Sequence, residues 1–135
     1  MNQLERAYRR SSYEAAGAVA RVGRRSPALE AVLARLGGGG GARQGGFLGA
    51  WNPLSRRMPP GWNRRMQARL MQVARRLPAA AGWGGTACWQ EAHCLFAADP
   101  RRLAVLARRF RQAAFVLVRR GQPARLCWVF PRLRR

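Results

Sequence analysis

Glu91 and His93 are the residues of this sequence whose types and spacing best suit acid/base chemistry. They lie two positions apart in residues 86–97, an alternating run typical of a β-strand. The alternation predicts two faces, with Trp89, Glu91, His93 and Leu95 on one and Cys88, Gln90, Ala92 and Cys94 on the other. Neighbours on one face lie about 6 to 7 Å apart, so this carboxylate and imidazole are candidate catalytic groups for one ligand. The alternative is that Glu91 is a structural acid neutralised by arginine and His93 an ordinary strand residue.

Neither a metal nor a cofactor is expected. The predicted alternation separates His93 from Cys88 and Cys94, whereas a tetrahedral zinc site needs four converging ligands. The three cysteines are odd in number and form no CxxC pair, which favours free thiols and a cytoplasmic location over a disulfide framework. The glycine-rich residues 37–46 lack the phosphate-binding pattern GxxxxGK[ST] and are predicted to form a flexible surface loop.

A second set of candidates consists of polar residues in or near loops. They are Asn52, Ser55, Asn63 and Gln112. A polar cleft at the edge of the sheet is predicted, lined by Asn52, Asn63, Glu91 and Gln112. The reason is that sheets packed by helices tend to bind ligands at the carboxyl ends of their strands. The alternative is structural, since asparagine and serine in turns usually bond to nearby backbone groups and cap helices.

The basic residues are unusual in number and in type. All 26 are arginine, opposed by five acids, and the formal net charge is +21. Two predicted helices carry nine of them away from their apolar stripes: Arg64, Arg65, Arg69, Arg75, Arg76, Arg101, Arg102, Arg108 and Arg109. Because arginine binds phosphate bidentately, these faces favour a polyanion such as a nucleic-acid backbone, bound without sequence readout. Two alternatives remain open, a GC-rich coding bias and an acidic protein partner.

The elements that must position these side chains follow from apolar periodicity and from capping residues. Ser26 before Pro27 and Asp99 before Pro100 each indicate the start of a helix. The predicted order is a weak strand or hairpin over 13–22, a helix over 27–36, a strand over 47–51, a helix over about 62–77, a strand over 86–97, a helix over 100–110, hairpin strands over 112–118 and 125–130, and a basic tail over 131–135.

This alternation predicts a single α/β (α+β) domain over residues 1–135. One mixed sheet of about five strands would be packed by about three helices, because each helix has one apolar stripe to bury. The longest apolar runs fall far short of the roughly 18 residues that a membrane-spanning helix needs. The oligomeric state stays open.

An ordered set of motifs resembles the bacterial family called domain of unknown function 3293. The motifs are AWNPxS over 50–55, Asn63, WxE over 89–91 and FxQAA over 110–114. The resemblance runs from about Tyr8 to Phe130 and implies a small stand-alone cytoplasmic domain without an assigned role. It also implies a polar signature at Asn52, Ser55, Asn63, Glu91 and Gln112. Three residues depart from the family pattern: Gly49 replaces a small hydroxyl residue, His93 a serine and Arg111 a glycine.

Three functions are compatible with these patterns. The first is a non-catalytic module that binds polyanions through its arginine-rich helix faces. The second is a small-molecule-binding protein or modest enzyme with a site around Asn52, Asn63, Glu91 and Gln112. The third is a subunit whose charge is neutralised by an acidic protein. The family resemblance implies that any shared function does not depend on the charge, because the family as a whole is less basic.

Overall fold

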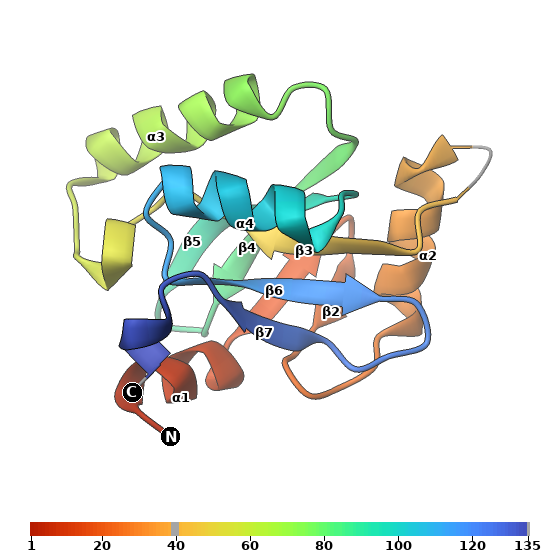
Figure 1. The fold of residues 1–135 in the computed structure, drawn as a ribbon, viewed down its shortest axis with the longest axis horizontal. Coiled ribbons are helices and arrows are strands. Elements are labelled where there is room, and N and C mark those ends of the chain that lie inside the picture. Colours follow the sequence, from red (N-terminus) through yellow and green to blue (C-terminus); the bar gives the residue numbers. More distant parts are fainter. Residues whose placement is uncertain (39–40, 135) are drawn as a thin grey trace.

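The computed structural model describes residues 1–38 and 41–134 (Figure 1). Its elements in chain order are α1 (Gln3–Arg10), β1 (Ser12–Ala15), β2 (Ala18–Ala20), α2 (Pro27–Leu36), β3 (Gln44–Leu48), the short 3-10 helix η2 (Pro53–Ser55), α3 (Pro60–Val73), β4 (Ala79–Gly85), β5 (Gln90–Phe96), α4 (Pro100–Arg109), β6 (Ala114–Arg119), β7 (Arg125–Trp128) and the 3-10 helix η3 (Pro131–Arg134). No helix within the described residues is both long and apolar enough to cross a bilayer.

The strands form one seven-stranded sheet in the order β2-β1-β4-β5-β3-β6-β7. Every pair of neighbouring strands is antiparallel. The predicted α+β class is therefore confirmed, but the mixed sheet is wrong, and the strands outnumber the five expected. One reason is β4, whose sequence AAAGWGG has no β-branched residue and so gives no strand signal. It pairs with β5 as a hairpin, and residues 86–89, predicted to begin a strand, form the turn.

The sheet curls so far that its two edge strands meet at one end. Val22, just after β2, forms an isolated bridge with Ala124, just before β7. The amide of Gly23 donates to the carbonyl of Ala124 at 2.8 Å, and the amide of Ala124 donates to the carbonyl of Arg24 at 2.9 Å. The curl gives the sheet an enclosed face and an outer face, each with its own hydrophobic core.

The helices divide between these two faces (Figure 1). On the outer face, Leu70 of α3 and Leu103 of α4 share a core with Phe115 of β6. On the enclosed face, Leu29 and Leu33 of α2 belong to a core that includes residues near both edge strands. Both predicted helix starts are confirmed: Ser26 Oγ accepts from the amide of Leu29 at 3.3 Å, and Asp99 Oδ1 accepts from the amide of Arg101 at 2.8 Å.

Other boundaries differ from the prediction. β3 spans Gln44–Leu48, so the last three residues of the predicted loop 37–46 lie in a strand, while 39 and 40 fall outside the described residues. Glycine is needed there, because a Cβ at Gly45 would collide with the backbone carbonyl of Phe96, and one at Gly46 would come within 2.9 Å of the Val116 carbonyl oxygen. Residues 13–22, predicted as a weak strand or hairpin, contain the antiparallel hairpin of β1 and β2, whereas α1 was not predicted. The tail forms η3 over its first four residues, and Arg135 lies outside the described residues.

Candidate ligand-binding site

A loop between β3 and α3 carries Asn52, and its backbone is left-handed at several residues. The φ angles are 48° at Asn52, 50° at Leu54 and 64° at Ser55. Asparagine tolerates this region better than most residues do, which explains its place at the turn. The backbone N–H of Asn52 donates to Asn63 Oδ1 at 3.0 Å, and the side-chain Nδ2 of Asn63 donates to Asn52 Oδ1 at 3.0 Å. This reciprocal pair fixes the loop against the first turn of α3.

Gln112 joins the same loop to the end of α4. Its Nε2 donates to the carbonyls of Trp51 and Phe110, both at 3.1 Å. The amide of Leu54 donates to the carbonyl of Arg111 at 2.6 Å, and Arg111 itself has a left-handed φ of 52°. Asn52, Asn63 and Gln112 are buried, with exposed fractions of 8%, 2% and 8%. Gln112 therefore bonds to the backbone and the two asparagines bond to each other, which leaves Asn52 Nδ2 to donate to Glu91.

Glu91 of β5 is the group that this buried network presents to the outside. Its Oε1 accepts from Asn52 Nδ2 at 2.6 Å and from Trp89 Nε1 at 3.2 Å. Its Oε2 lies 3.9 Å from His93 Nε2, beyond ordinary hydrogen-bonding distance. Burial opposes ionisation of this carboxyl, but the adjacent His93 imidazole and the hydrogen bonds from Asn52 and Trp89 outweigh it and hold the pKa of Glu91 below its ordinary value. The carboxylate is thus ionised at neutral pH.

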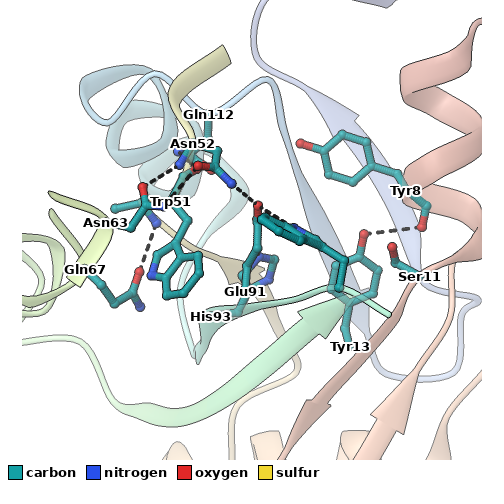
Figure 2. Close-up of polar contacts among 12 residues, drawn as sticks. Tyr8, Ser11, Tyr13, Trp51, Asn52, Asn63, Gln67, Glu91, His93 and Gln112 are labelled. Carbon is teal, nitrogen blue, oxygen red and sulfur yellow. Dashed lines mark hydrogen bonds and ion pairs between the residues drawn. The ribbon is translucent and has the colours of Figure 1, made fainter. Parts of the chain in front are cut away.

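His93 is held beside Glu91 by tight packing. A Cβ at Gly49 would come within 2.7 Å of His93 Cδ2, and a Cβ at Gly84 within 2.7 Å of His93 Nδ1. The imidazole also stacks on Tyr13, with ring centroids 5.7 Å apart. Its Nδ1 is buried without a hydrogen-bond partner, which favours the tautomer with the proton on Nε2, towards Glu91. Figure 2 shows Glu91 and His93 between the amide network and the two tyrosines.

These groups border a pocket of about 340 Å³ on the enclosed side of the sheet. Of the predicted site residues, Asn52, Ser55, Glu91, His93 and Gln112 line it. Asn63 does not, because it supports Asn52 from behind. Ser55 is exposed at the rim. Asn52, Glu91 and Gln112 thus line one pocket, as predicted. Glu91 is partly exposed, whereas Asn52 and Gln112 are buried.

The pocket also has aromatic and basic members that the sequence did not assign to a site. Trp89 lines the pocket and is 45% exposed. The sequence feature that indicates Trp89 as a site residue is its position two residues before Glu91, on the same predicted strand face. Tyr8, Tyr13 and Arg57 also line the pocket, and no local pattern connects them to Glu91. Burial and the nearby Glu91 charge raise the pKa of both tyrosines, so their hydroxyls stay protonated at neutral pH.

The arginine-rich helix faces are separate from this pocket. All nine arginines predicted to bind polyanions are exposed, on α3, on α4 or in the turn that follows α3. Within the described residues, the arginines that form ion pairs are Arg9, with Glu5, and Arg25, with Glu30. None of the nine therefore has an acidic partner among the residues that the structure describes. The described residues also contain no group of three His, Cys, Asp or Glu side chains that would hold a metal ion.

The segment that carries most of this site matches a known family. The family described as "protein of unknown function (DUF3293)" matches residues 48–115, half of the chain. The chain belongs to this family. The matched segment contains Asn52, Ser55, Asn63, Glu91 and Gln112, so the resemblance carried by these motifs is confirmed. No curated protein and no solved structure matches the chain.

Proposed function

We propose that this protein binds a small molecule in the pocket beside Glu91. The observation that carries the proposal is an ionised carboxylate, fixed by neighbouring N–H groups, at the wall of a 340 Å³ pocket with aromatic sides. Pockets of this size, mostly apolar with a few fixed polar groups, are typical of small-molecule sites. The pocket's polar wall also lies within the segment that matches the family.

Binding is favoured over catalysis by the geometry of Glu91 and His93. A general base needs a free lone pair within hydrogen-bonding reach of the substrate. The free lone pair of His93 in the favoured tautomer is on Nδ1, which is buried against β4 at Gly84. We therefore assign His93 to positioning Glu91 and assign no reaction to the pair.

A thermal-shift screen of metabolites and fragments tests this proposal. Compounds that bind in the pocket should raise the melting temperature of the wild type but not of Trp89→Ala. Trp83→Ala is the matched control, because Trp83 is 49% exposed on β4 and does not line the pocket. The proposal fails if no compound stabilises the wild type, or if the stabilisation is the same in Trp89→Ala.

A second candidate function, binding of a polyanion, is favoured by the nine exposed arginines, which have no acidic partner among the described residues. Arg101, Arg102, Arg108 and Arg109 lie on the exposed side of α4, and α3 carries more beside it over the same outer core. Affinity for nucleic acid should then fall steeply with salt. An acidic protein partner is the other source of negative charge, and recovery of a clean monomer at physiological salt would count against it.

Filter binding over a range of salt concentrations tests the polyanion candidate. Replacing the four α4 arginines by glutamine should weaken binding of single-stranded RNA and reduce the slope of log K against log salt, by about 0.7 for each phosphate that is no longer neutralised. The matched control replaces four exposed arginines elsewhere, Arg6, Arg10, Arg24 and Arg35. Equally weakened binding in the two variants would show that only net charge matters, and an absence of salt-sensitive binding would remove the candidate.

We also propose a reducing, cytoplasmic location. The support is that Cys88, Cys94 and Cys127 are all free. Burial raises the pKa of Cys94 to about 12 and also raises that of Cys127, so both stay protonated and unreactive at neutral pH.

A further inference from the structure

We propose that the ligand of this pocket is dipolar, with a protonated amine that meets Glu91 and an anionic group that meets Arg57. The inference rests on the proposed small-molecule function and names the chemical class of the ligand. Its basis is that the pocket holds two opposite charges in contact with one aromatic side chain, Trp89: Arg57 lies over its ring and Glu91 accepts from its N–H.

The acidic end of the pocket has an oxygen available for a ligand. Glu91 Oε1 already accepts from two N–H groups, those of Asn52 and Trp89. Its Oε2 has His93 Nε2 at 3.9 Å and no hydrogen bond from any described side chain. The Glu91 side chain is 23% exposed, so a donor entering the pocket can reach it. A single free carboxylate oxygen suits an ammonium group, because one N–H donates to one acceptor.

The basic end of the pocket is formed by Arg57. Its Cζ lies 5.3 Å from the centre of the Trp89 ring, a cation–π contact that holds the guanidinium near the rim. Arg57 is exposed, and no acid within the described residues pairs with it. A guanidinium placed in this way has donors free for a carboxylate or a phosphate, which it can bind bidentately.

Trp89 fixes the separation of the two charges. Its indole N–H bonds to Glu91 and its ring lies beneath Arg57, so the two charged groups are positioned by the same side chain. The other walls add aromatic surface from Tyr8, Tyr13 and Phe47. A ligand with an apolar or aromatic body and charges at two points therefore complements the pocket better than a simple cation or anion does.

The charge of the whole chain supports a ligand that is not a simple cation. At +21 the protein repels free cations at long range, and screening limits that repulsion to about 8 Å at physiological ionic strength. A dipolar molecule has little net charge to repel and still supplies the ammonium group for Glu91. Its anionic end is attracted by the arginine-rich surface as it enters.

A series of indole probes tests the inference by isothermal titration calorimetry. The probes are 3-methylindole, which is neutral, tryptamine, which has only the amine, indole-3-propionate, which has only the carboxylate, and tryptophan, which has both. The phosphonate analogue of tryptophan distinguishes phosphate-type from carboxylate-type anions. Tryptophan or its phosphonate should bind at least about tenfold more tightly than 3-methylindole, as expected for charge-assisted hydrogen bonds.

Two substitutions then assign the two ends. Glu91→Gln should abolish the extra affinity that the amine of a probe provides and keep the extra affinity that its anionic group provides. Arg57→Gln should abolish the contribution of the anionic group and keep that of the amine. The matched controls are Glu14→Gln and Arg56→Gln, since Glu14 and Arg56 lie outside the pocket lining, and both should bind like the wild type. Melting curves of all four variants establish that they are folded.

The outcomes separate this inference from the proposed function. If 3-methylindole and tryptophan bind equally well, and Glu91→Gln changes neither, the dipolar ligand is wrong while the pocket still binds small molecules. The same holds if tryptamine alone gains affinity, because the anionic end then has no role. If none of the probes binds and the metabolite screen is also empty, the inference and the proposed function fail together.

Discussion

Gly49 and His93 share a space that a side chain from only one of them can fill. A Cβ at Gly49 would come within 2.7 Å of His93 Cδ2, and the neighbouring Ala92 carbonyl is 2.8 Å from it. Both residues depart from the family resemblance, which has a small hydroxyl residue at the first position and a serine at the second. The structure therefore explains the two departures as one exchange of volume between adjacent strands β3 and β5.

This coupling predicts how the two residues respond to substitution. Gly49→Ser alone should lower the free energy of unfolding by about 1 to 3 kcal/mol, because the new side chain meets the imidazole. Combined with His93→Ser, it should regain the part of that stability that the clash with the ring costs, while the Ala92 carbonyl oxygen still crowds the new Cβ. Urea denaturation of the two single variants and the double variant measures the coupling. If the changes in unfolding free energy of the two single variants simply add in the double variant, the two side chains do not compete for the same space.

The ionised state of Glu91 predicts a specific dependence of stability on pH. Its hydrogen bonds lower its pKa in the folded protein below the ordinary value of 4.5. A carboxyl with a lowered folded pKa stabilises the fold above its unfolded pKa, and this contribution is lost as the pH falls through the folded pKa. Relative to Glu91→Gln, the wild type should thus lose stability below about pH 4.5. The prediction is contradicted if the denaturation midpoints of the wild type and of Glu91→Gln change in parallel from neutral to acidic pH.

At the scale of elements, α1 completes a site whose polar wall lies elsewhere in the chain. It contributes Tyr8 to the pocket, yet it lies outside the segment that matches the family. Contacts from outside the helix hold it in place: Tyr13 Oη donates to the Tyr8 carbonyl at 3.3 Å, and the Tyr8 ring meets the distant Trp128 edge-on at 6.1 Å. Asn2 Nδ2 also donates to the Leu133 carbonyl at 2.7 Å. The C-terminal segment thus helps to hold the N-terminal helix that forms this wall of the pocket.

Tyr8→Ala tests the role of α1. The variant should remain folded with a lowered melting temperature, because the ring no longer packs against Trp128 while both hydrophobic cores keep their buried residues. Any compound found to bind the pocket should lose affinity by tenfold or more, as expected for an aromatic contact worth about 1.5 kcal/mol. Arg6→Ala is the control, since Arg6 is exposed on the same helix and does not line the pocket. Unchanged affinity in Tyr8→Ala would show that α1 is not part of the site.

The parts of this structure that sequence predicts are those with local causes. Ser26–Pro27 and Asp99–Pro100 fix helix starts within a few residues, and strand alternation places Glu91 and His93 on one face. Features that depend on distant partners have no such signal. Gly45 and Gly46 fall in the predicted loop because their strand role comes from the close approach of Phe96 and Leu103. Likewise, α1 depends on contacts with the other end of the chain, and Arg57 enters the site through its contact with Trp89.

At the scale of the whole molecule, the charge of +21 acts on a fold with few internal countercharges. Two of the arginines in the described residues pair with an acid, Arg9 and Arg25. The remaining charges repel one another across the surface, which destabilises the compact state. Salt, a polyanion or an acidic partner would relieve this repulsion in the folded protein. The extent of the relief depends on how close the negative charges come to the arginines.

Stability should therefore rise with ionic strength, in contrast to a protein held together by surface ion pairs. Between ~0.01 M and ~1 M salt the Debye length falls from about 30 Å to about 3 Å, which removes most of the repulsion. A gain of 1 kcal/mol would raise the melting temperature by roughly 3 to 6 °C for a chain of this size. Sodium sulfate at matched ionic strength separates screening from binding, because an anion held by the α4 arginines adds stability that the Arg→Gln quadruple variant of α4 lacks. A melting temperature that stays constant or falls as sodium chloride is added would show that the arginines do not destabilise the fold, and the charge would then give no thermodynamic reason for a polyanion.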